Sequence, residues 1–281
     1  MYSQEQVNKL LQAATPDVLS SSVLIVGAKK SSWGAMGSGV LFQIADYHFV
    51  VTAAHTIRCA YSNSITLGMS CDDNRFLVFR SDFDVSDLAS FFNFDDILDI
   101  AIYKLNSEEI GRLKSSRFLR QSDVANVLEN GICTVFGYPS ALADKPRNNE
   151  PLNVKGLTFT VPIYTGTTDG FDNFDNKYSF LLDASWSSSG VDGRSLQMSD
   201  LSDRAANTLR DLKGLSGGPV WMVGTSGTNP ATWGRDLPKL VGLQVGVYPE
   251  RDLVRATRWS VVLGFLKRRY PELSQALELA I

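Results

Sequence analysis

Short apolar runs, separated by small and polar residues, dominate the chain from residue 21 to residue 248. The runs occupy residues 21–28, 37–44, 47–54, 64–69, 74–79, 99–105, 131–139, 157–165, 178–185, 218–224 and 240–248. They are rich in β-branched and aromatic residues, which favours strands. Because many short strands follow one another with few helices between them, the pattern predicts an all-β barrel or sandwich rather than alternating β-α-β units.

Apolar residues change to a helical spacing at both ends of the chain. Near the N-terminus, Ser3 and Gln6 resemble a capping box ahead of apolar residues spaced as on a helix, so a short amphipathic helix is expected. Residues 261–266 and 273–279 predict further helix at the C-terminus. Residues 141–156 and 166–177 are predicted surface loops, and 186–211 an excursion that ends in a helix over 200–212.

Charge and composition exclude several classes of function. The formal net charge is −3, so the basic surface typical of nucleic-acid-binding proteins is not expected. No apolar run approaches the roughly 18 residues of a membrane span, and the N-terminus does not read as a signal peptide. Three cysteines and two histidines, with no CxxC pair, argue against a disulfide framework and a metal site. The sequence predicts a cytoplasmic protein without cofactor, membrane or nucleic-acid partner.

The segment KGLSGGPVW (213–221) is the first candidate for chemistry. Three glycines around Ser216 would let the backbone take positive φ or approach other groups closely. A tight turn before a strand is one reading of such a stretch. The other reading is a nucleophile loop, in which backbone N–H groups point at a developing oxyanion. The second reading requires a base and an acid elsewhere in the chain.

The two histidines and a small set of aspartates supply those candidates. His48 lies inside the run YHFVV and reads as an ordinary strand residue. His55 ends VVTAAH, where small residues leave room for an imidazole to turn into a cleft, and its usual pKa suits proton transfer at neutral pH. In DDILDIAIYKL, Asp99 opens an apolar strand, whereas Asp95 and Asp96 read as solvated turn or capping residues.

Chain order separates the known serine-hydrolase architectures. Residues 214–218 also match the GxSxG elbow of α/β-hydrolases, but that architecture needs a histidine after the serine, and none follows Ser216. The subtilisin order needs an aspartate before His55, where only Asp17 and Asp46 occur without a convincing context. The order His55, Asp99, Ser216 is that of chymotrypsin.

These segments carry a family resemblance. VVTAAH, DIAIYKL and KGLSGGPVW, in that order, resemble the signature segments of trypsin-like (chymotrypsin-fold) serine proteases, and GSGVLF and VFGYP resemble two further strands of that fold. The resemblance covers about residues 22–270 and is nearest to the bacterial, intracellular, disulfide-free branch. It implies two antiparallel β-barrels: an N-terminal helical extension over 1–20, a first barrel over 21–125, and a second barrel with the C-terminal helix over 126–281.

The resemblance also implies roles for the candidates. Ser216 would be the nucleophile, His55 the general base and then acid, and Asp99 the group that fixes the imidazole tautomer. The backbone N–H groups of Gly214 and Ser216 would form the oxyanion hole. An aspartate precedes the nucleophile in family members activated by cleavage, but Leu215 stands here, so no N-terminal trimming is expected.

Candidate substrate-binding residues follow from the same resemblance. Arg210 stands where the family lines its specificity pocket, and a basic pocket would favour acidic substrate residues. The preferred interpretation, however, places Arg210 on the solvent face of the preceding helix. Gln244, Val245, Gly246 and Val247 would form the strand along which a substrate adds by β-pairing. Arg255 and Arg258 are further pocket candidates.

The sequence therefore predicts a serine endopeptidase that cleaves protein or peptide substrates through an acyl-enzyme. Because a free cytoplasmic protease is hazardous, narrow specificity or gating is also expected, by a regulatory protein partner or by residues 186–211. Two alternatives stay open: a catalytically silent binding module on the same fold, and a hydrolase of small esters.

Overall fold

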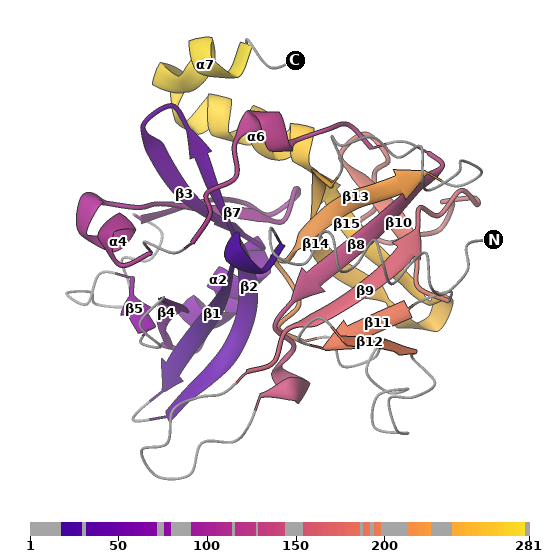
Figure 1. Ribbon diagram of the computed structural model, residues 1–281, viewed down its shortest axis with the longest axis horizontal. Helices are drawn as coiled ribbons and strands as arrows, with labels where there is room; N and C mark the ends of the chain where they lie inside the picture. The colour runs from indigo at the N-terminus through magenta and orange to yellow at the C-terminus, as the bar shows by residue number, and fades with distance from the viewer. Residues whose placement is uncertain are drawn as a thin grey trace.

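The computed structural model describes residues 18–29, 32–71, 76–79, 91–113, 116–127, 129–143, 154–185, 188–191, 194–197, 213–225 and 238–278. They form two antiparallel sheets that lie side by side, one from each half of the chain (Figure 1). The first sheet has the strand order β5-β4-β1-β2-β3-β7-β6, and the second β10-β15-β14-β13-β8-β9-β11-β12. The predicted all-β class, with two antiparallel barrels and a C-terminal helix, is confirmed.

The strands of the first sheet are β1 (Ser22–Lys29), β2 (Ser32–Ile44), β3 (Tyr47–Thr52), β4 (Thr66–Ser70), β5 (Phe76–Val78), β6 (Phe92–Asp95) and β7 (Ile100–Lys104). Those of the second are β8 (Gly131–Gly137), β9 (Leu157–Pro162), β10 (Ser179–Asp183), β11 (Ser188–Val191), β12 (Arg194–Gln197), β13 (Pro219–Thr225), β14 (Lys239–Tyr248) and β15 (Leu253–Arg258). The helices are α2 (Ala54–Ser62), α4 (Ser107–Gly111), α6 (Trp259–Arg269) and α7 (Ser274–Glu278).

Both sheets curl around their own apolar cores. In the second sheet β9 returns to β10 through an Ile163–Leu182 bridge and a 2.9 Å hydrogen bond from Tyr164 N to Leu181 O, which closes the barrel. In the first sheet the two edges approach each other where the rings of Phe79 and Phe92 meet edge-on at 5.4 Å.

A third apolar core lies between the two barrels. In β3, Val50 packs into the first barrel while its neighbours Phe49 and Val51 face this shared core. Such a strand is buried on both faces, which explains why the run YHFVVT is apolar without strict alternation. The shared core holds the two barrels together and so fixes how residues of one meet residues of the other.

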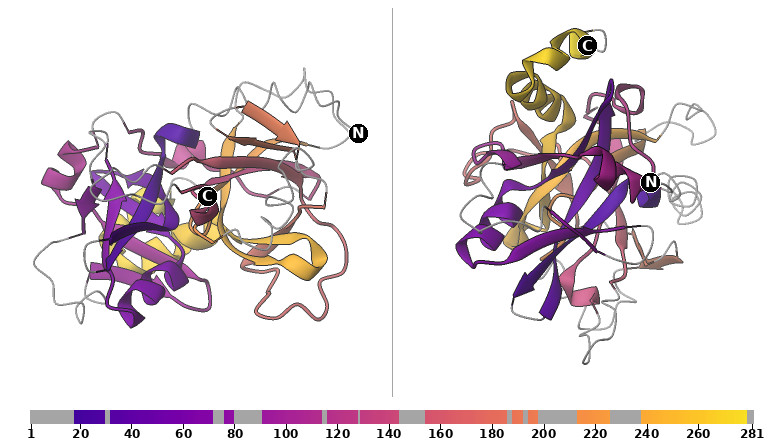
Figure 2. Two further views of the ribbon diagram at one scale, coloured as in Figure 1. Left: turned by 90° about the horizontal axis from the view of Figure 1, so that it is seen from below. Right: turned by 90° about the vertical axis from the view of Figure 1, so that its left-hand side faces the viewer.

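The C-terminal helices complete the shared core. Trp259, at the start of α6, is fully buried, and its indole meets the ring of Phe42 at 5.2 Å. Beyond α6, the Tyr270 hydroxyl is 2.9 Å from the Asn93 side chain of β6. Helices α6 and α7, which follow the second barrel in sequence, therefore pack onto the first barrel (Figures 1 and 2).

Each predicted apolar run contains one strand, and three elements went unpredicted near the candidate site. β15 carries two arginines within LVRATR, and β6 is only four residues long, so neither shows a strong apolar run. α2 begins at Ala54, within the predicted run 47–54. β11 and β12 form a hairpin inside the predicted excursion. The predicted helices over the N-terminus and 200–212 lie outside the described residues.

Candidate active site

His55, in the first turn of α2, meets Asp99, which directly precedes β7. Asp99 Oδ2 lies 2.8 Å from His55 Nδ1, and Asp99 Oδ1 accepts the His55 backbone N–H at 3.0 Å. The Asp99 side chain is 12% exposed and the His55 side chain 50% exposed. One carboxylate therefore fixes both the backbone and the ring of His55, and leaves the Nε2 edge of the imidazole toward the solvent-facing side.

The turn before β7 holds Asp99 in an unusual conformation. Asp99 has φ +54°, a left-handed value that is costly for a residue other than glycine. Its carbonyl accepts from Ala54 N at 3.2 Å, and the preceding Leu98 carbonyl accepts from Thr257 Oγ1 at 2.8 Å. Hydrogen bonds from Ala54 of α2 and Thr257 of β15 thus stabilise the strained backbone of this turn, which directly precedes β7.

Asp95 and Asp96, which precede Asp99 in the chain, act as turn and surface residues, as the sequence indicated. Asp95 Oδ1 accepts the backbone N–H groups of Ile97 and Leu98, at 3.1 and 3.0 Å, and so shapes the turn. Asp96 is half-exposed and forms an ion pair with Arg58 of α2. Neither carboxylate contacts His55.

Asp99 has a second neighbour, the guanidinium of Arg255. Arg255 Nη2 lies 3.6 Å from Asp99 Oδ2, and the Arg255 side chain is only 15% exposed. Val254 and Ala256 point into the second barrel, so Arg255, between them, faces the opposite side of β15, where Asp99 lies.

The loop around Ser216 is packed directly against the first barrel. Gly217 has φ +87°, and a Cβ added there would lie 2.1 Å from Ser38 O and 2.3 Å from Thr52 Oγ1. At Gly214 φ is +93°, and an added Cβ would lie 2.6 Å from Tyr138 O. These positions require glycine, both for backbone conformation and for the close approach of other backbone atoms.

Ser38 of β2 makes the hydrogen bonds that join the first barrel to this loop. Its N–H donates to Ser216 O at 2.8 Å, and its hydroxyl donates to Gly214 O at 2.8 Å while accepting from Tyr138 N at 2.9 Å. Ser38 is fully buried. Ser38 was not predicted as a site residue; its only signal in the sequence is a small polar residue between two glycines in GSGVLF.

The Ser216 loop reaches the N-terminal end of α2, where His55 lies. A Cβ added at Gly37 would meet Thr56 Cγ2 at 2.6 Å and Ser216 O at 3.2 Å, so the Ser216 backbone lies beside Thr56. Among the hydrogen bonds of the described residues, none joins the Ser216 hydroxyl to His55. The structure thus brings the Ser216 loop and His55 into one region without a hydrogen bond between the two side chains.

The two backbone N–H groups predicted for the oxyanion hole are available. No hydrogen bond among the described residues uses the N–H of Gly214 or of Ser216 as donor. By contrast, the Gly217 N–H donates to Gln244 O at 2.8 Å, and the Gly218 N–H to Leu215 O at 3.0 Å. The N–H groups of Gly217 and Gly218 therefore already have acceptors within the protein, whereas those of Gly214 and Ser216 can donate to a bound ligand.

The strand predicted to bind substrate, residues 244–247, lies beside this loop, but its first residue is not free to pair with a substrate. Gln244 is buried, and its own N–H and C=O are bonded to Gly218 and Gly217, so they cannot pair with a substrate. Beyond Leu243, β13 no longer pairs with β14, and the β14 edge over 245–248 that faces away from β15 has no partner strand among the described residues. The free edge thus begins after Gln244.

The remaining predicted residues lie elsewhere. His48 is on β3 with its ring edge-on to Phe118 at 4.7 Å, which fits the ordinary strand role expected of it. Arg258 lies at the end of β15, on the opposite face from Arg255. Arg210 lies outside the described residues.

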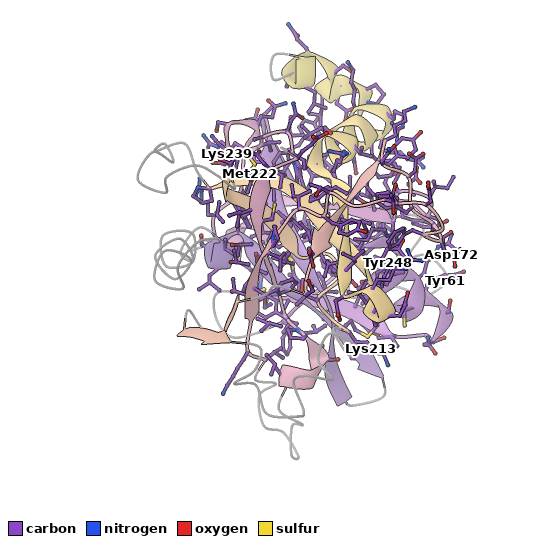
Figure 3. The ribbon with its side chains drawn as sticks, turned by 90° about the vertical axis from the view of Figure 1, so that its right-hand side faces the viewer. Tyr61, Asp172, Lys213, Met222, Lys239 and Tyr248 are labelled. Carbon is purple, nitrogen blue, oxygen red and sulfur yellow. The ribbon has the colours of Figure 1, made fainter. Side chains whose placement is uncertain are left out.

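A loop between β9 and β10 borders the face of β15 that carries Arg255. The Arg255 guanidinium donates to Asn173 O, and the Tyr248 hydroxyl donates to Asp172 O at 2.7 Å. Figure 3 shows Tyr248 and Asp172 next to each other at the molecular surface. The loop over 171–176 is thus attached through its backbone carbonyls to side chains of β14 and β15.

The described part of the chain contains no group of three or more His, Cys, Asp or Glu side chains arranged to hold a metal ion. Every helix among the described residues is too short or too polar to cross a bilayer. All three cysteines are free thiols, with Cys59 exposed and Cys133 buried.

Comparisons with known proteins give structural matches only. No protein-family model and no curated protein matches the sequence. A chain solved in work on the coupled folding and binding of the intrinsically disordered Sesbania mosaic virus VPg protein is 15% identical, with a TM-score of 0.42 over 86% of this chain and 87% of that one.

Two further structures match at a similar level. The MamO protease domain from Magnetospirillum magneticum is 14% identical, with a TM-score of 0.41 over 88% of this chain and 96% of that one. Deg5 is 11% identical, with a TM-score of 0.45 over 94% of each chain. Matches at these identities and scores assign no residue role and no activity to this protein.

Proposed function

We propose that the protein is a serine endopeptidase in which Ser216 attacks the scissile carbonyl and forms an acyl-enzyme. His55 takes the serine proton and then donates it to the leaving amine, and Asp99 holds the imidazole with its Nδ1 protonated. The observation that carries the proposal is the pair of hydrogen bonds between His55 and Asp99, from the imidazole Nδ1 at 2.8 Å and from the backbone N–H at 3.0 Å. This pair lies beside a glycine-rich serine loop.

Two further features, one in the serine loop and one on the neighbouring strand β14, support the same reaction. The Gly214 and Ser216 N–H groups have no acceptor among the described residues, and two such donors stabilise the oxyanion of a tetrahedral intermediate. The free edge of β14 over 245–248 offers backbone groups to an extended peptide, which suits a peptide substrate better than a small ester.

A specific observation favours the second candidate, a catalytically silent binding module. No hydrogen bond among the described residues joins the Ser216 hydroxyl to His55, and a nucleophile requires its base within reach. We favour the enzyme because catalytic hydrogen bonds are often long in structures without substrate and shorten in the complex.

The deciding experiment is labelling by a fluorophosphonate probe, which reacts with an activated serine. We expect labelling of the unmodified protein, none of Ser216→Ala, and severe loss in His55→Ala. Asp99→Asn should slow labelling by roughly 10³–10⁴-fold, because the wrong imidazole tautomer is then favoured. No labelling of a protein with a cooperative unfolding transition would reject the enzyme and leave the binding module.

Cleavage assays then separate peptide from ester hydrolysis. A peptide library and p-nitrophenyl acetate are offered to the same preparation, with Ser216→Ala as the blank. Turnover of the ester alone would reject the endopeptidase assignment and support a small-ester hydrolase. We also propose a cytoplasmic setting, where free thiols such as those present here stay reduced. Control by a regulatory protein partner stays a prediction.

A further inference from the structure

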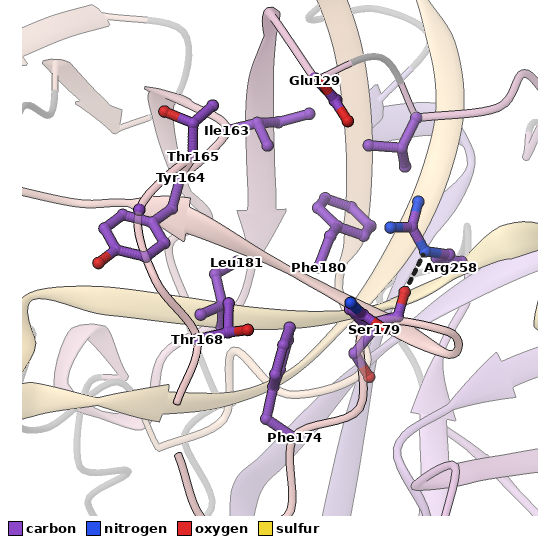
Figure 4. Close-up of a pocket in the computed structure, with 13 residues that line it drawn as sticks. Glu129, Ile163, Tyr164, Thr165, Thr168, Phe174, Ser179, Phe180, Leu181 and Arg258 are labelled. Atoms are coloured by element: carbon purple, nitrogen blue, oxygen red, sulfur yellow. Dashed lines mark hydrogen bonds between the residues drawn. The ribbon is translucent and has the colours of Figure 1, made fainter. Parts of the chain in front are cut away.

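A cavity of about 570 Å³ opens at one mouth of the second barrel (Figure 4). Its lining comes from the segment before β8, the segment after β9, the start of β10 and the end of β15. The Ser216 loop contacts β8 at the opposite end, where an added Cβ at Gly137 would lie 3.0 Å from Leu215 O. Since a strand rises about 3.3 Å per residue, β8 separates the two places by about 20 Å. The cavity is therefore distinct from the candidate active site.

Arg258 is the principal charged group in the cavity wall. Its Nε donates to Asn176 O at 3.2 Å, and its guanidinium lies 5.7 Å from the centre of the Phe180 ring. Among the described residues no carboxylate forms an ion pair with it, and its two terminal nitrogens donate no hydrogen bond. Figure 4 shows the guanidinium beside Phe180 at the cavity wall.

Burial of this arginine is not compensated by a counter-charge. The side chain is half-buried, and desolvation lowers the pKa of its guanidinium. A cation taken partly out of water without an anion is unfavourable, so an anionic ligand would gain more here than at an exposed arginine. The unused terminal nitrogens form a planar fork suited to a carboxylate.

The rest of the wall sets the shape and polarity of the ligand. Phe174 and Phe180 present aromatic surface, and Ile163 and Leu181 add aliphatic surface. Thr165 and Thr168 contribute hydroxyl groups on the same wall. A site with one cation and several aromatic rings suits a small anion that carries a flat apolar group.

From these contacts we propose that the cavity binds a small organic carboxylate with an aromatic or flat apolar body. The carboxylate bonds to the terminal nitrogens of Arg258, and the apolar body packs against the apolar residues that line the cavity. Glu129, on the rim, lies on the same wall and disfavours a doubly charged group such as phosphate. One singly charged carboxylate thus fits the charge of this site better than a phosphate.

Sodium benzoate is the probe that tests the proposal, with binding measured by calorimetry or by ligand-observed NMR on the full chain. Benzamide has the same shape without the charge, and inorganic phosphate has the charge without the ring. The Arg258→Met variant keeps an apolar side chain over Phe180 and removes the two terminal guanidinium nitrogens that would bind the carboxylate. Arg251→Met is the matched control, since Arg251 is exposed and stacks on Phe171 at 4.1 Å, outside the cavity wall.

We expect benzoate to bind at least about tenfold more tightly than benzamide or phosphate, because the charge-assisted bonds and the ring contacts both contribute. Arg258→Met should weaken benzoate by about tenfold or more, Arg251→Met by less than about twofold, and Glu129→Gln should strengthen it. Equal binding of benzoate and benzamide, or no binding of benzoate, overturns the proposal. That comparison needs no variant, and none of these measurements depends on the proposed protease activity.

Discussion

At Gly217, where φ is +87°, the backbone lies so close to the first barrel that an added Cβ would be 2.1 Å from Ser38 O and 2.3 Å from the Thr52 hydroxyl oxygen. The loop has no regular secondary structure of its own, so single backbone contacts decide where the Ser216 hydroxyl and the Gly214 and Ser216 N–H groups point. Ser38 makes two of those contacts, to Ser216 O and Gly214 O, and its hydroxyl also accepts a hydrogen bond from Tyr138 N. At the residue scale, activity should therefore depend on groups that never touch the substrate.

Gly217→Ala should displace the loop, because the new methyl group would lie 2.1 Å from a carbonyl oxygen and the φ value is unfavourable for alanine. We expect a loss of more than about 2 kcal/mol in the free energy of unfolding, measured in urea, and no fluorophosphonate labelling. Gly34→Ala is the control, since nothing lies within 4 Å of a Cβ added there. A Gly217→Ala protein that labels normally would contradict this account of the loop.

Ser38→Ala should lower kcat by about tenfold or more while leaving the protein folded. It removes two side-chain hydrogen bonds in a buried position, which costs about 1–3 kcal/mol, and it frees Gly214 O from its donor. Ser70→Ala provides the comparison, because the Ser70 hydroxyl also accepts a backbone N–H, from Leu24 at 3.1 Å, but away from the serine loop. Equal effects of the two variants on kcat would show that Ser38 has no special part in positioning the loop.

At the scale of elements, β15 connects three parts of the candidate site. Thr257 donates to the Leu98 carbonyl in the turn before Asp99, and Arg255 lies between the Asp99 carboxylate and the backbone of the 171–176 loop. One strand of the second barrel thus positions a side chain that belongs to the first barrel. Asp99 and its strained turn depend on this strand as much as on β7, which follows directly.

Arg255→Met should reduce kcat more than it changes KM, by roughly 3- to 30-fold. The reason is that the variant removes the second partner of Asp99 and one anchor of the 171–176 loop, each equivalent to about one hydrogen bond to a charged group. Steady-state kinetics on the best library peptide would measure it, with Arg251→Met as the control. A change confined to KM would indicate a substrate-binding role for Arg255 instead.

At the scale of the whole molecule, three apolar cores make the two barrels and the C-terminal helices one unit. The core between the barrels includes residues from both sheets and from α6, so the candidate site, which combines residues of both barrels, depends on how the halves pack together. Cys133 lies fully buried in the core of the second barrel, where desolvation raises the pKa of its thiol far above the usual range. This thiol makes the global stability dependent on pH.

The sign of that dependence follows from proton binding. In the unfolded chain the Cys133 thiol ionises near pH 8.5, whereas in the folded protein it stays protonated, so the unfolded state binds fewer protons above that pH. Its contribution is fully present below about pH 8.5, and stability should then fall by up to about 1.4 kcal/mol per pH unit. Urea unfolding between pH 7 and pH 10 would measure the slope. Cys133→Ala should flatten it, and alanine at the exposed Cys59 should not; equal slopes in both variants would exclude Cys133 as the cause.

The apolar runs and the order of three short segments already determined much about this protein. Each predicted run contains a strand, because a buried strand needs β-branched and aromatic residues wherever it lies in the fold. His55 and Asp99 could be singled out because a histidine after small residues and an aspartate before an apolar strand are unusual locally. They lie in hydrogen-bond contact, and their catalytic role stays a prediction.

Only the tertiary structure decided which other residues belong to the site. Thr257 has no local signal, Ser38 shows only a small polar residue between two glycines, and Arg255 was named only as a pocket candidate. Each acts through partners 100 or more positions away in the sequence. The cavity around Arg258 likewise combines four segments that are separate in sequence. Local composition reflects whether a segment is buried, whereas contacts between distant segments depend on how the two barrels and the C-terminal helices pack, and no short stretch of sequence carries that information.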